Sequence, residues 1–340
     1  MTSEFELIDA IRARFGERGG RVLVGSGDDA AVTRCDGVTV TSVDGFVEGV
    51  HFRLATTSMR DLGHKCLAAS LSDVAATGAS PGEAYMALGL PPNIGEREVL
   101  ELMDGADGLA AELGVSICGG DLTASSELFV AMTVVGHAPD EDALLGRDGA
   151  QVGDVVGVTG RLGGAGAGLV LLERKGHGVP VEVGERLLER QRQPRPLIAT
   201  GTALARSPAH AMIDVSDGVA SDALRIAEES GVALEIELGR LPIDDGVEAV
   251  AEIAGTSADR FAATAGEDYE LLFTCSVDAR DEIESAVEET GTTVTWIGTV
   301  RSGDGVRLLD ARGEAVALSG WDHFGSEEQD RSPHKGPASR

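Results

Sequence analysis

Lysine is scarce in this chain, whose 340 residues include only Lys65, Lys175 and Lys335. None of them follows a glycine, so the Gly-Lys-[Ser/Thr] element of a P-loop is missing. Bases are scarce overall, because 57 aspartates and glutamates outnumber 28 lysines and arginines and give a formal net charge of −29. This charge repels the phosphates of nucleic acids at long range, so we expect no nucleic-acid partner.

Cysteine patterns and apolar runs of membrane length are also missing. The four cysteines are far apart, without a Cys-x-x-Cys pair or nearby paired histidines, which argues against a zinc site or a disulfide framework. The longest apolar stretches, such as residues 128–135, are far shorter than the roughly 20 residues of a membrane helix. The N-terminus begins with acids and lacks the basic flank of a signal peptide. We therefore expect a cytoplasmic protein with no membrane contact.

Several common site motifs are absent or weak. The chain has no Gly-x-Ser-x-Gly nucleophile elbow, and residues 214–218 lack the acid spacing of an EF-hand. Residues 25–30 fit the dinucleotide pattern G-x-G-x-x-[GA], but two aspartates inside this loop would repel a bare pyrophosphate. The loop suits phosphates only if metal ions lie between them. The glycine-rich run 160–168 favours a flexible helix entry over a phosphate cradle.

Short acidic clusters beside glycine or serine are the most distinctive feature that is present. They are Gly27-Asp28-Asp29-Ala30, Ser42-Val43-Asp44-Gly45, Gly119-Gly120-Asp121 and Asp214-Val215-Ser216-Asp217-Gly218. We expect tight turns at strand or helix ends, where carboxylates converge on Mg²⁺ and backbone N–H groups face phosphate. Because lysines are few and a P-loop is missing, Mg²⁺ held by aspartates would supply most of the positive charge to a bound polyphosphate, with arginine helping.

Alternating apolar segments predict an α/β protein, and the length is sufficient for two domains. The predicted strands are 22–24, 38–43, 84–90, 115–118, 128–137, 155–159, 211–214, 232–237, 270–275 and 294–300. The predicted helices are 5–15, 58–76, 97–113, 163–175, 184–191, 196–205, 219–229 and 280–289. The polar stretch 139–154 predicts a boundary between domains 1–138 and 139–324, and residues 325–340 are predicted to form a disordered tail.

The helix at 58–76 carries a further acid of interest. Ser58-x-x-Asp61 predicts an N-terminal capping box, which places Asp73 in the last turns. A lone aspartate there is unfavourable against the negative end of the helix dipole unless a cation compensates it. Asp73 is therefore either a candidate cation ligand or simply an exposed acid.

Seven motifs, in order along almost the whole chain, resemble those of the thiamine-monophosphate kinases, in the ATP-binding superfamily that includes aminoimidazole-ribonucleotide synthetase. The motifs are Gly-Ser-Gly-Asp-Asp-Ala-Ala (25–31), Ser-Val-Asp-Gly-Phe-Val-Glu-Gly-Val-His-Phe (42–52), Leu-Ser-Asp-Val-Ala-Ala-Thr-Gly-Ala (71–79), Gly-Gly-Asp-Leu-Thr (119–123), Ile-Asp-Val-Ser-Asp-Gly (213–218), Gly-Glu-Asp-Tyr-Glu-Leu (266–271) and Trp-Asp-His-Phe (321–324).

The resemblance implies transfer of the ATP γ-phosphoryl group to thiamine monophosphate, giving ADP and thiamine diphosphate, with several Mg²⁺ ions. A phosphate acceptor is already anionic at neutral pH, so the task is to hold two anionic phosphates in line rather than to remove a proton. The resemblance also implies a two-domain α/β fold with mixed sheets. Its N-terminal domain binds ATP and Mg²⁺ and pairs strands across a homodimer, and its C-terminal α/β domain closes over the cleft.

Site residues follow from the resemblance position by position. It assigns Mg²⁺ to Asp29, Ser42, Val43 (through its backbone), Asp44, Asp73, Asp121, Asp214 and Asp217, with Asp28 as a companion. It assigns ATP contacts to Gly120, Arg147 and Ser216, and contacts to the substrate to His51, Glu267 and Trp321. A carboxylate and an aromatic face suit the cationic thiazolium and the aminopyrimidine of thiamine. The residues alone also allow a structural histidine at 51, a surface or capping acid at 267 and a packing aromatic at 321.

The alternative functions are another ATP-dependent enzyme of the same superfamily and a non-enzymatic divalent-cation binder. Selenophosphate synthetase needs a reactive N-terminal cysteine or selenocysteine with a partner lysine, whereas the first cysteine here is Cys35. The hydrogenase-maturation dehydratase ends in a reactive cysteine, whereas this chain ends in Pro-Ala-Ser-Arg. Aminoimidazole-ribonucleotide synthetase has a Gly-Thr-Lys element where this chain has residues 46–51. A non-enzymatic divalent-cation binder would bind metal and ignore nucleotide.

Overall fold

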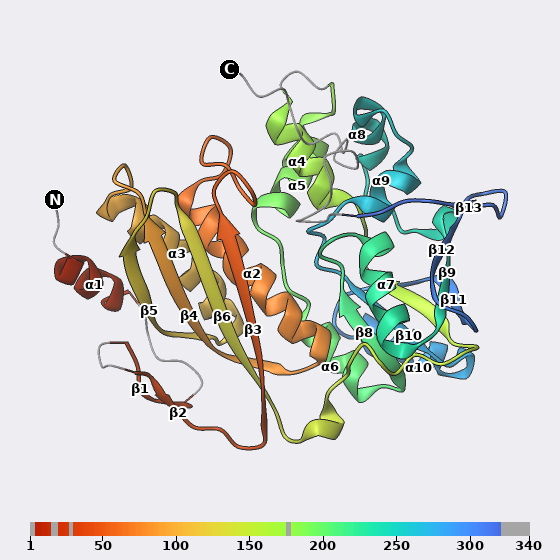
Figure 1. Ribbon diagram of the computed structural model, residues 1–340, viewed down its shortest axis with the longest axis horizontal. Helices are drawn as coiled ribbons and strands as arrows, with labels where there is room; N and C mark the ends of the chain where they lie inside the picture. Colours follow the sequence, from red (N-terminus) through yellow and green to blue (C-terminus); the bar gives the residue numbers. More distant parts are fainter. Residues whose placement is uncertain (1–3, 15–19, 27–29, 175–177, 321–340) are drawn as a thin grey trace. The chain divides into compact units, whose positions relative to one another are not determined.

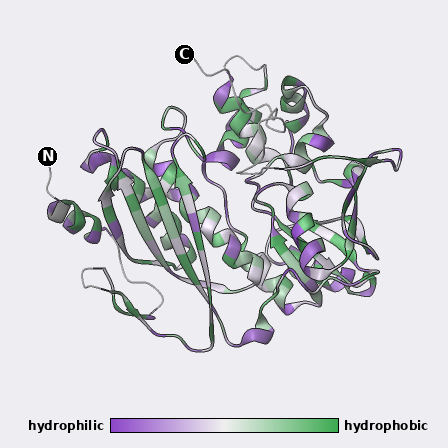
Figure 2. Cartoon of the chain, in the orientation of Figure 1, coloured by the Kyte–Doolittle hydropathy of each residue, from purple (hydrophilic) through white to green (hydrophobic). Residues whose placement is uncertain are grey.

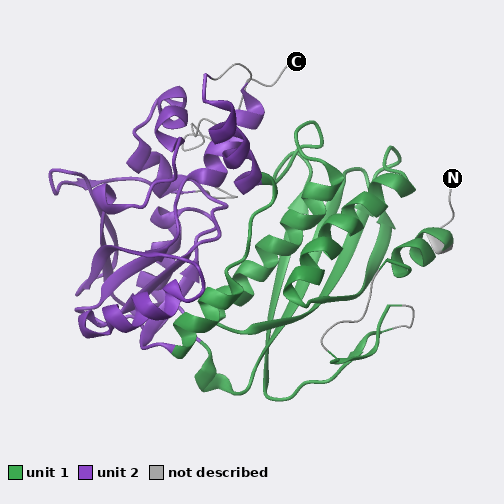
Figure 3. Ribbon diagram, turned by 180° about the vertical axis from the view of Figure 1, so that it is seen from behind, with its two compact units in different colours: residues 1–144, 192–206 green, residues 145–191, 207–340 purple. Residues whose placement is uncertain are grey.

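The computed structural model of the protein describes residues 4–14, 20–26, 30–174 and 178–320. It divides into two compact units (Figure 3): unit 1 comprises residues 1–144 and 192–206, and unit 2 comprises residues 145–191 and 207–340. Residues 192–206 thus return to unit 1 after the chain has entered unit 2, a path that no sequence signal predicted. The domain limits at residues 138 and 324 remain predictions.

Unit 1 is built on a four-stranded sheet in the order β3-β6-β4-β5, in which β4 and β5 are parallel and the other neighbours antiparallel. Helices α2 and α3 lie on one face of this sheet (Figures 1 and 3), and Figure 2 shows apolar residues along its strands. The elements are α1 (Glu4–Arg12), β1 (Val22–Val24), β2 (Val32–Thr33), β3 (Val38–Val47), α2 (Met59–Thr77), β4 (Ser80–Leu90), α3 (Glu96–Leu113), β5 (Ser116–Ala124), β6 (Phe129–Ala138), the short η1 (Glu141–Ala143) and α6 (Ile198–Arg206).

Helix α2 is the packing centre of unit 1. The Ser58 Oγ accepts a hydrogen bond from the Asp61 N–H at 3.1 Å, which confirms the predicted N-cap, and the helix ends at Gly78 with φ 80°. Where α2 meets α3, a Cβ on Gly63 would lie 1.9 Å from the Leu102 carbonyl oxygen. A Cβ on Gly105 would likewise lie 1.9 Å from the Arg60 carbonyl oxygen. Glycine at both positions therefore lets the two backbones approach.

Unit 2 is built on a seven-stranded mixed sheet in the order β13-β12-β9-β11-β7-β10-β8, in which β9 and β12 are parallel. The elements are β7 (Val155–Thr159), α4 (Gly164–Glu173), α5 (Val181–Arg192), β8 (Ala209–Asp214), α7 (Val219–Ser230), β9 (Ala233–Glu237), η2 (Leu238–Arg240), α8 (Val247–Ala254), α9 (Ala258–Thr264), β10 (Leu271–Cys275), η3 (Val277–Ala279), α10 (Arg280–Glu288), β11 (Val294–Arg301), β12 (Gly305–Leu309) and β13 (Ala315–Val316).

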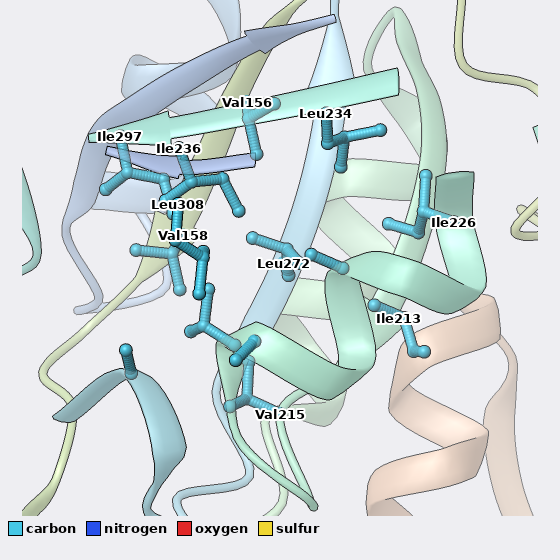
Figure 4. Close-up of a cluster of buried hydrophobic side chains, with 14 of the residues drawn as sticks. Val156, Val158, Ile213, Val215, Ile226, Leu234, Ile236, Leu272, Ile297 and Leu308 are labelled. Atoms are coloured by element: carbon cyan, nitrogen blue, oxygen red, sulfur yellow. The ribbon is translucent and has the colours of Figure 1, made fainter. Parts of the chain in front are cut away.

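The core of unit 2 lies between this sheet and helix α7 (Figure 4). It is made of fully buried aliphatic side chains, among them Val158, Leu234, Leu272 and Ile297 from four strands and Ile226 from α7. A second buried cluster joins the helices α4, α5, α8 and α9. Ile213 and Val215, on either side of Asp214, belong to the first cluster, so the apolar core fixes the end of β8.

The α/β class with mixed sheets is confirmed, and most predicted elements occur within a few residues of their expected bounds. Five short elements, β2, α8, α9, β12 and β13, were not predicted from the sequence. Within the part of the chain that the structure describes, no helix has the length and apolar character needed to cross a membrane.

Two acidic motifs expected in turns at strand ends lie inside strands instead. Strand β3 continues through Asp44, which pairs with Met132, and β5 continues through Asp121, which pairs with Ala87. Aspartate and glycine are poor strand formers, so the local sequence predicted a turn at both places. Pairing with β6 and β4 overrides that preference, and the two aspartates are held on a rigid sheet.

Candidate metal and nucleotide site

Ser42, Asp44 and Asp73 come together in unit 1 between β3 and α2. Residues of β3 alternate, so Ser42 and Asp44 point toward α2 while Val43 between them is 66% exposed. The Ser42 hydroxyl donates a short hydrogen bond to Asp73 Oδ2 on α2. Helix and strand therefore bring a carboxylate from each side to one place.

Asp44 is in an environment that disfavours its own charge. Burial raises its pKa, the nearby Ser70 hydroxyl opposes this rise, and the negative charge of Asp73 adds to it. Within the described residues, nothing donates a hydrogen bond to the buried Asp44 Oδ2. A buried carboxylate oxygen without a donor, beside a second carboxylate, fits a hard cation such as Mg²⁺.

Gly120 and Asp121 lie on the far edge strand of the same sheet. Met132 pairs with Asp44 on β3 and with Met86 on β4, and Met86 pairs with Gly120 on β5. Three strand spacings therefore separate Asp44 from Gly120, about 14 Å. A Cβ on Gly120 would lie 1.8 Å from the Met86 carbonyl oxygen, so only glycine fits there. The structure of unit 1 does not bring Asp121 to Asp44 and Asp73.

His51 lies in the turn that follows β3. Its Nδ1 accepts a hydrogen bond from the Val47 N–H at 3.1 Å, and its ring contacts Phe46 edge-on at 6.1 Å between centroids. In the neutral ring the proton is then on Nε2, which makes Nε2 a hydrogen-bond donor. The turn therefore offers a donor suited to an anionic group.

In unit 2, two motifs that lie far apart in the sequence are hydrogen-bonded to each other. After β8, the Val215 N–H donates to the Glu270 carbonyl at 2.7 Å, and the Tyr269 N–H donates to the Val215 carbonyl at 2.9 Å. The Glu267 N–H donates to the Ser216 carbonyl at 2.7 Å. The loop that carries Ser216 and Asp217 and the loop that carries Glu267 therefore form one element.

The Glu267 loop is strained. Glu267 and Tyr269 have φ angles of 66° and 52°, and they are the residues other than glycine with positive φ in the described chain. A Cβ on Gly266 would lie 2.4 Å from the Ser216 carbonyl oxygen. Left-handed backbone costs a non-glycine residue on the order of 1 kcal/mol or more and is retained mainly at functional sites. This strain supports a binding role for the Glu267 loop.

The glycine-rich turn before α4 is occupied by a carboxylate. Asp268 accepts hydrogen bonds from the Gly163 N–H at 2.6 Å and from the Ala165 N–H at 3.1 Å. Burial raises the pKa of Asp268 to about 7, against the opposing effects of the Arg190 charge and these N–H groups. Because Asp268 already uses the helix N-terminus, the turn is a helix entry and not a phosphate cradle.

Comparison with known proteins agrees with these observations. The N-terminal domain of the AIR synthase related protein family matches residues 27–138, and the C-terminal domain of that family matches residues 151–311. The chain belongs to this family.

Several proteins similar to this chain are thiamine-monophosphate kinases. A thiamine-monophosphate kinase of Mycobacterium tuberculosis is 33% identical to this chain over 333 residues, 97% of this chain and 94% of the relative. The crystal structure of thiamine-monophosphate kinase from Stenotrophomonas maltophilia K279a has a TM-score of 0.80 at 37% identity and covers 92% of this chain and 98% of that chain. The structure of AaThiL complexed with AMPPCP and TMP has a TM-score of 0.74 at 30% identity, with coverages of 94% and 97%.

Two further predicted site residues, Arg147 and Asp214, lie in unit 2. Arg147 is exposed, and its carbonyl accepts a hydrogen bond from the Ser230 hydroxyl at 2.7 Å. Asp214 is buried at the end of β8. Asp28, Asp29 and Trp321 lie outside the described residues. Gly320, which precedes Trp321, donates its N–H to Ser221 Oγ at 2.9 Å, beside the 214–218 loop.

Two polar residues that contact the Asp217 and Glu267 loops, Asp222 and Gln191, were not predicted from the sequence. Asp222, buried in the first turn of α7, accepts a hydrogen bond from the Asp217 N–H at 3.1 Å. Burial raises the pKa of Asp222, and the charges of Asp214 and Asp217 add to the rise. Gln191, near the end of α5, donates a hydrogen bond from its Nε2 to Glu267 Oε2. Asp222 could have been found from its helical spacing after the motif, whereas Gln191 has no sequence signal.

The described carboxylates of each unit form no complete metal site on their own. Among the residues that the structure describes, no three or more His, Cys, Asp or Glu side chains are arranged to hold a metal ion. What the described residues provide is a pair of carboxylates with an unsatisfied oxygen in unit 1, and a loop pair in unit 2.

Proposed function

We propose that the protein is a thiamine-monophosphate kinase that transfers the γ-phosphoryl group of ATP to thiamine monophosphate in the presence of Mg²⁺. The named relatives and the complex with AMPPCP, an ATP analogue, and TMP support the reaction and both substrates. The observation that carries the proposal from geometry is the buried Asp44 Oδ2, which lacks a donor among the described residues and lies beside Asp73. An oxygen of this kind is suited to a cation that accompanies phosphate.

The carboxylates hold the metal and the phosphates in this proposal. Bound Mg²⁺ would neutralise phosphate charge during in-line transfer. Its proposed ligands are Asp29, Ser42, the Val43 backbone, Asp44, Asp73, Asp121, Asp214 and Asp217. Gly120, Arg147 and Ser216 are proposed to contact ATP, and the planar guanidinium of Arg147 suits a phosphate.

The acceptor needs orientation more than activation. Its phosphate is already anionic, so no residue has to remove a proton. We assign His51 to the acceptor because its Nε2 can donate a hydrogen bond, and Glu267 and Trp321 to the cationic thiamine part. The hydrogen bond between the Glu267 N–H and the Ser216 carbonyl, at 2.7 Å, supports this assignment because it ties the acceptor residue to a nucleotide residue.

The test is product formation by the purified full chain with ATP and Mg²⁺, and with thiamine monophosphate, thiamine or no acceptor. We expect thiamine diphosphate, identified by chromatography, only from the monophosphate, and an equal amount of ADP. Chelation of the metal should abolish the product. ATP binding without thiamine diphosphate would refute the proposed acceptor, and metal binding without nucleotide binding would indicate a simple cation binder.

We also propose that the protein is a homodimer and that it is located in the cytoplasm. The sheet of unit 1 is covered by α2 and α3 on one face, whereas the other face carries Val43, 66% exposed, and the half-buried Tyr85, Ala131 and Val135. A second copy covering this face would bury these apolar groups. Light scattering at micromolar concentration should give twice the 35.1 kDa mass of one chain. A particle with the mass of one chain would contradict the dimer.

A further inference from the structure

Gln191, near the end of α5, holds the side chain of Glu267 in unit 2. The Gln191 side chain is buried, with 4% of the residue exposed. Its Nε2 donates a hydrogen bond to Glu267 Oε2 at 2.7 Å. An ionised carboxylate only accepts hydrogen bonds, so the amide must present its nitrogen and not its oxygen. The direction of this hydrogen bond is therefore fixed.

The backbone of Glu267 is held from another side. Its N–H donates to the Ser216 carbonyl at 2.7 Å, with φ at 66°. The Ser216 loop thus sets where the residue lies, and Gln191 sets where the carboxylate points. These two hydrogen bonds restrict the conformations of Glu267 before a ligand binds. Less conformational entropy of the Glu267 side chain is therefore lost on binding.

Arg190, which precedes Gln191 on α5, is a charged donor, but it pairs with other acids than Glu267. Arg190 makes ion pairs with Glu270 at 3.2 Å and with Asp244 at 3.4 Å, and both acids are buried. One turn of α5 therefore supplies a cation to two buried acids and a neutral amide to Glu267. A neutral donor orients a carboxylate without cancelling its charge, which suits a carboxylate that must attract a cation.

We infer that Gln191 is a positioning residue that sets recognition of the cationic part of the acceptor by orienting Glu267. This inference rests on the proposed function, in which Glu267 faces the thiamine part. It adds a residue outside the motifs that carry the resemblance, and it assigns that residue to the acceptor and not to ATP.

Gln191→Met keeps the length of the side chain and removes the donor. We expect the KM for thiamine monophosphate to rise about tenfold or more, because the Glu267 carboxylate loses the hydrogen bond that orients it. The KM for ATP and kcat should change less than about twofold, because the contact acts on acceptor binding alone. Gln191→Glu should raise the KM for the acceptor further, because it places a second carboxylate against Glu267.

Gln193→Met is the matched control. Gln193 also donates its Nε2 to a carboxylate, Asp61 Oδ1 at 2.8 Å, but this pair is exposed in unit 1. We expect this variant to match the wild type in both KM values. Melting curves check that both methionine variants are folded. An unchanged KM for the acceptor in folded Gln191→Met would overturn the inference, and so would an equal rise in both KM values.

A double-mutant cycle separates positioning from general packing. If Gln191 acts through Glu267, adding Gln191→Met to Glu267→Gln should change acceptor affinity less than twofold. Independent, multiplicative losses would overturn the inference.

The proposed function and this inference can fail separately. A wild type that binds thiamine monophosphate in calorimetry but makes no thiamine diphosphate refutes the proposed function alone, and the ratio of the wild-type and Gln191→Met dissociation constants then decides the inference. A wild type that neither binds nor phosphorylates thiamine monophosphate overturns both.

Discussion

Asp44→Asn is expected to lower the rate of thiamine diphosphate formation by about 10³-fold or more while the chain stays folded. Asparagine has nearly the same shape but lacks the charge that would hold a metal ion at the transferring group. Burial and Asp73 raise the pKa of Asp44, so at neutral pH its ionised form costs folding free energy. Removing this charge should therefore leave the free energy of unfolding unchanged or raise it when Mg²⁺ is absent.

Two measurements check the role of Asp44. Turnover is compared with Asp36→Asn, which makes the same substitution at an exposed position just before β3 and should keep wild-type activity. Thermal melting is measured with and without Mg²⁺ and a non-hydrolysable ATP analogue, and Asp44→Asn should lose most of the stabilisation that they give the wild type. Near-normal turnover in Asp44→Asn would refute its role as a metal ligand.

Elements with a strong local signal were predictable from the sequence. The predicted strand at 155–159 agrees with β7, and the predicted helix at 97–113 agrees with α3 within one residue. Both depend on periodicity and on residues close in the chain. Strands β3 and β5 were predicted too short because Asp44 and Asp121 are paired by other strands, which local preference does not register.

The candidate site could be predicted only in part for the same reason. The acidic motifs named the residues, but the hydrogen bond from Ser42 to Asp73 and the pairing of residues 215–216 with 267–270 join segments that are remote in sequence. Gln191 is an ordinary residue in a polar helix and becomes informative only through its contact with Glu267. The left-handed backbone of Glu267 is likewise imposed by its neighbours, since glutamate does not favour it.

Gly105→Ala is expected to lower the free energy of unfolding by about 3 kcal/mol or more, the largest stability effect that we predict. The added methyl group would lie 1.9 Å from the Arg60 carbonyl oxygen of α2, and a backbone atom cannot rotate away as a side chain can. Helices α2 and α3 would have to move apart along their contact, which also includes Gly63 and Leu102.

Gly108→Ala on the same helix is the control that isolates this contact. Gly108 is exposed, and a Cβ there has nothing within 4 Å. Both substitutions gain the helix preference of alanine, about 1 kcal/mol, so Gly108→Ala should be stabilising and the difference between the variants measures the clash. Denaturant unfolding of the full chain gives both values. Equal stabilities would show that α2 and α3 separate at little cost. Because α2 also carries Asp73, a destabilised contact should weaken stabilisation by Mg²⁺ and nucleotide in Gly105→Ala and leave it intact in Gly108→Ala.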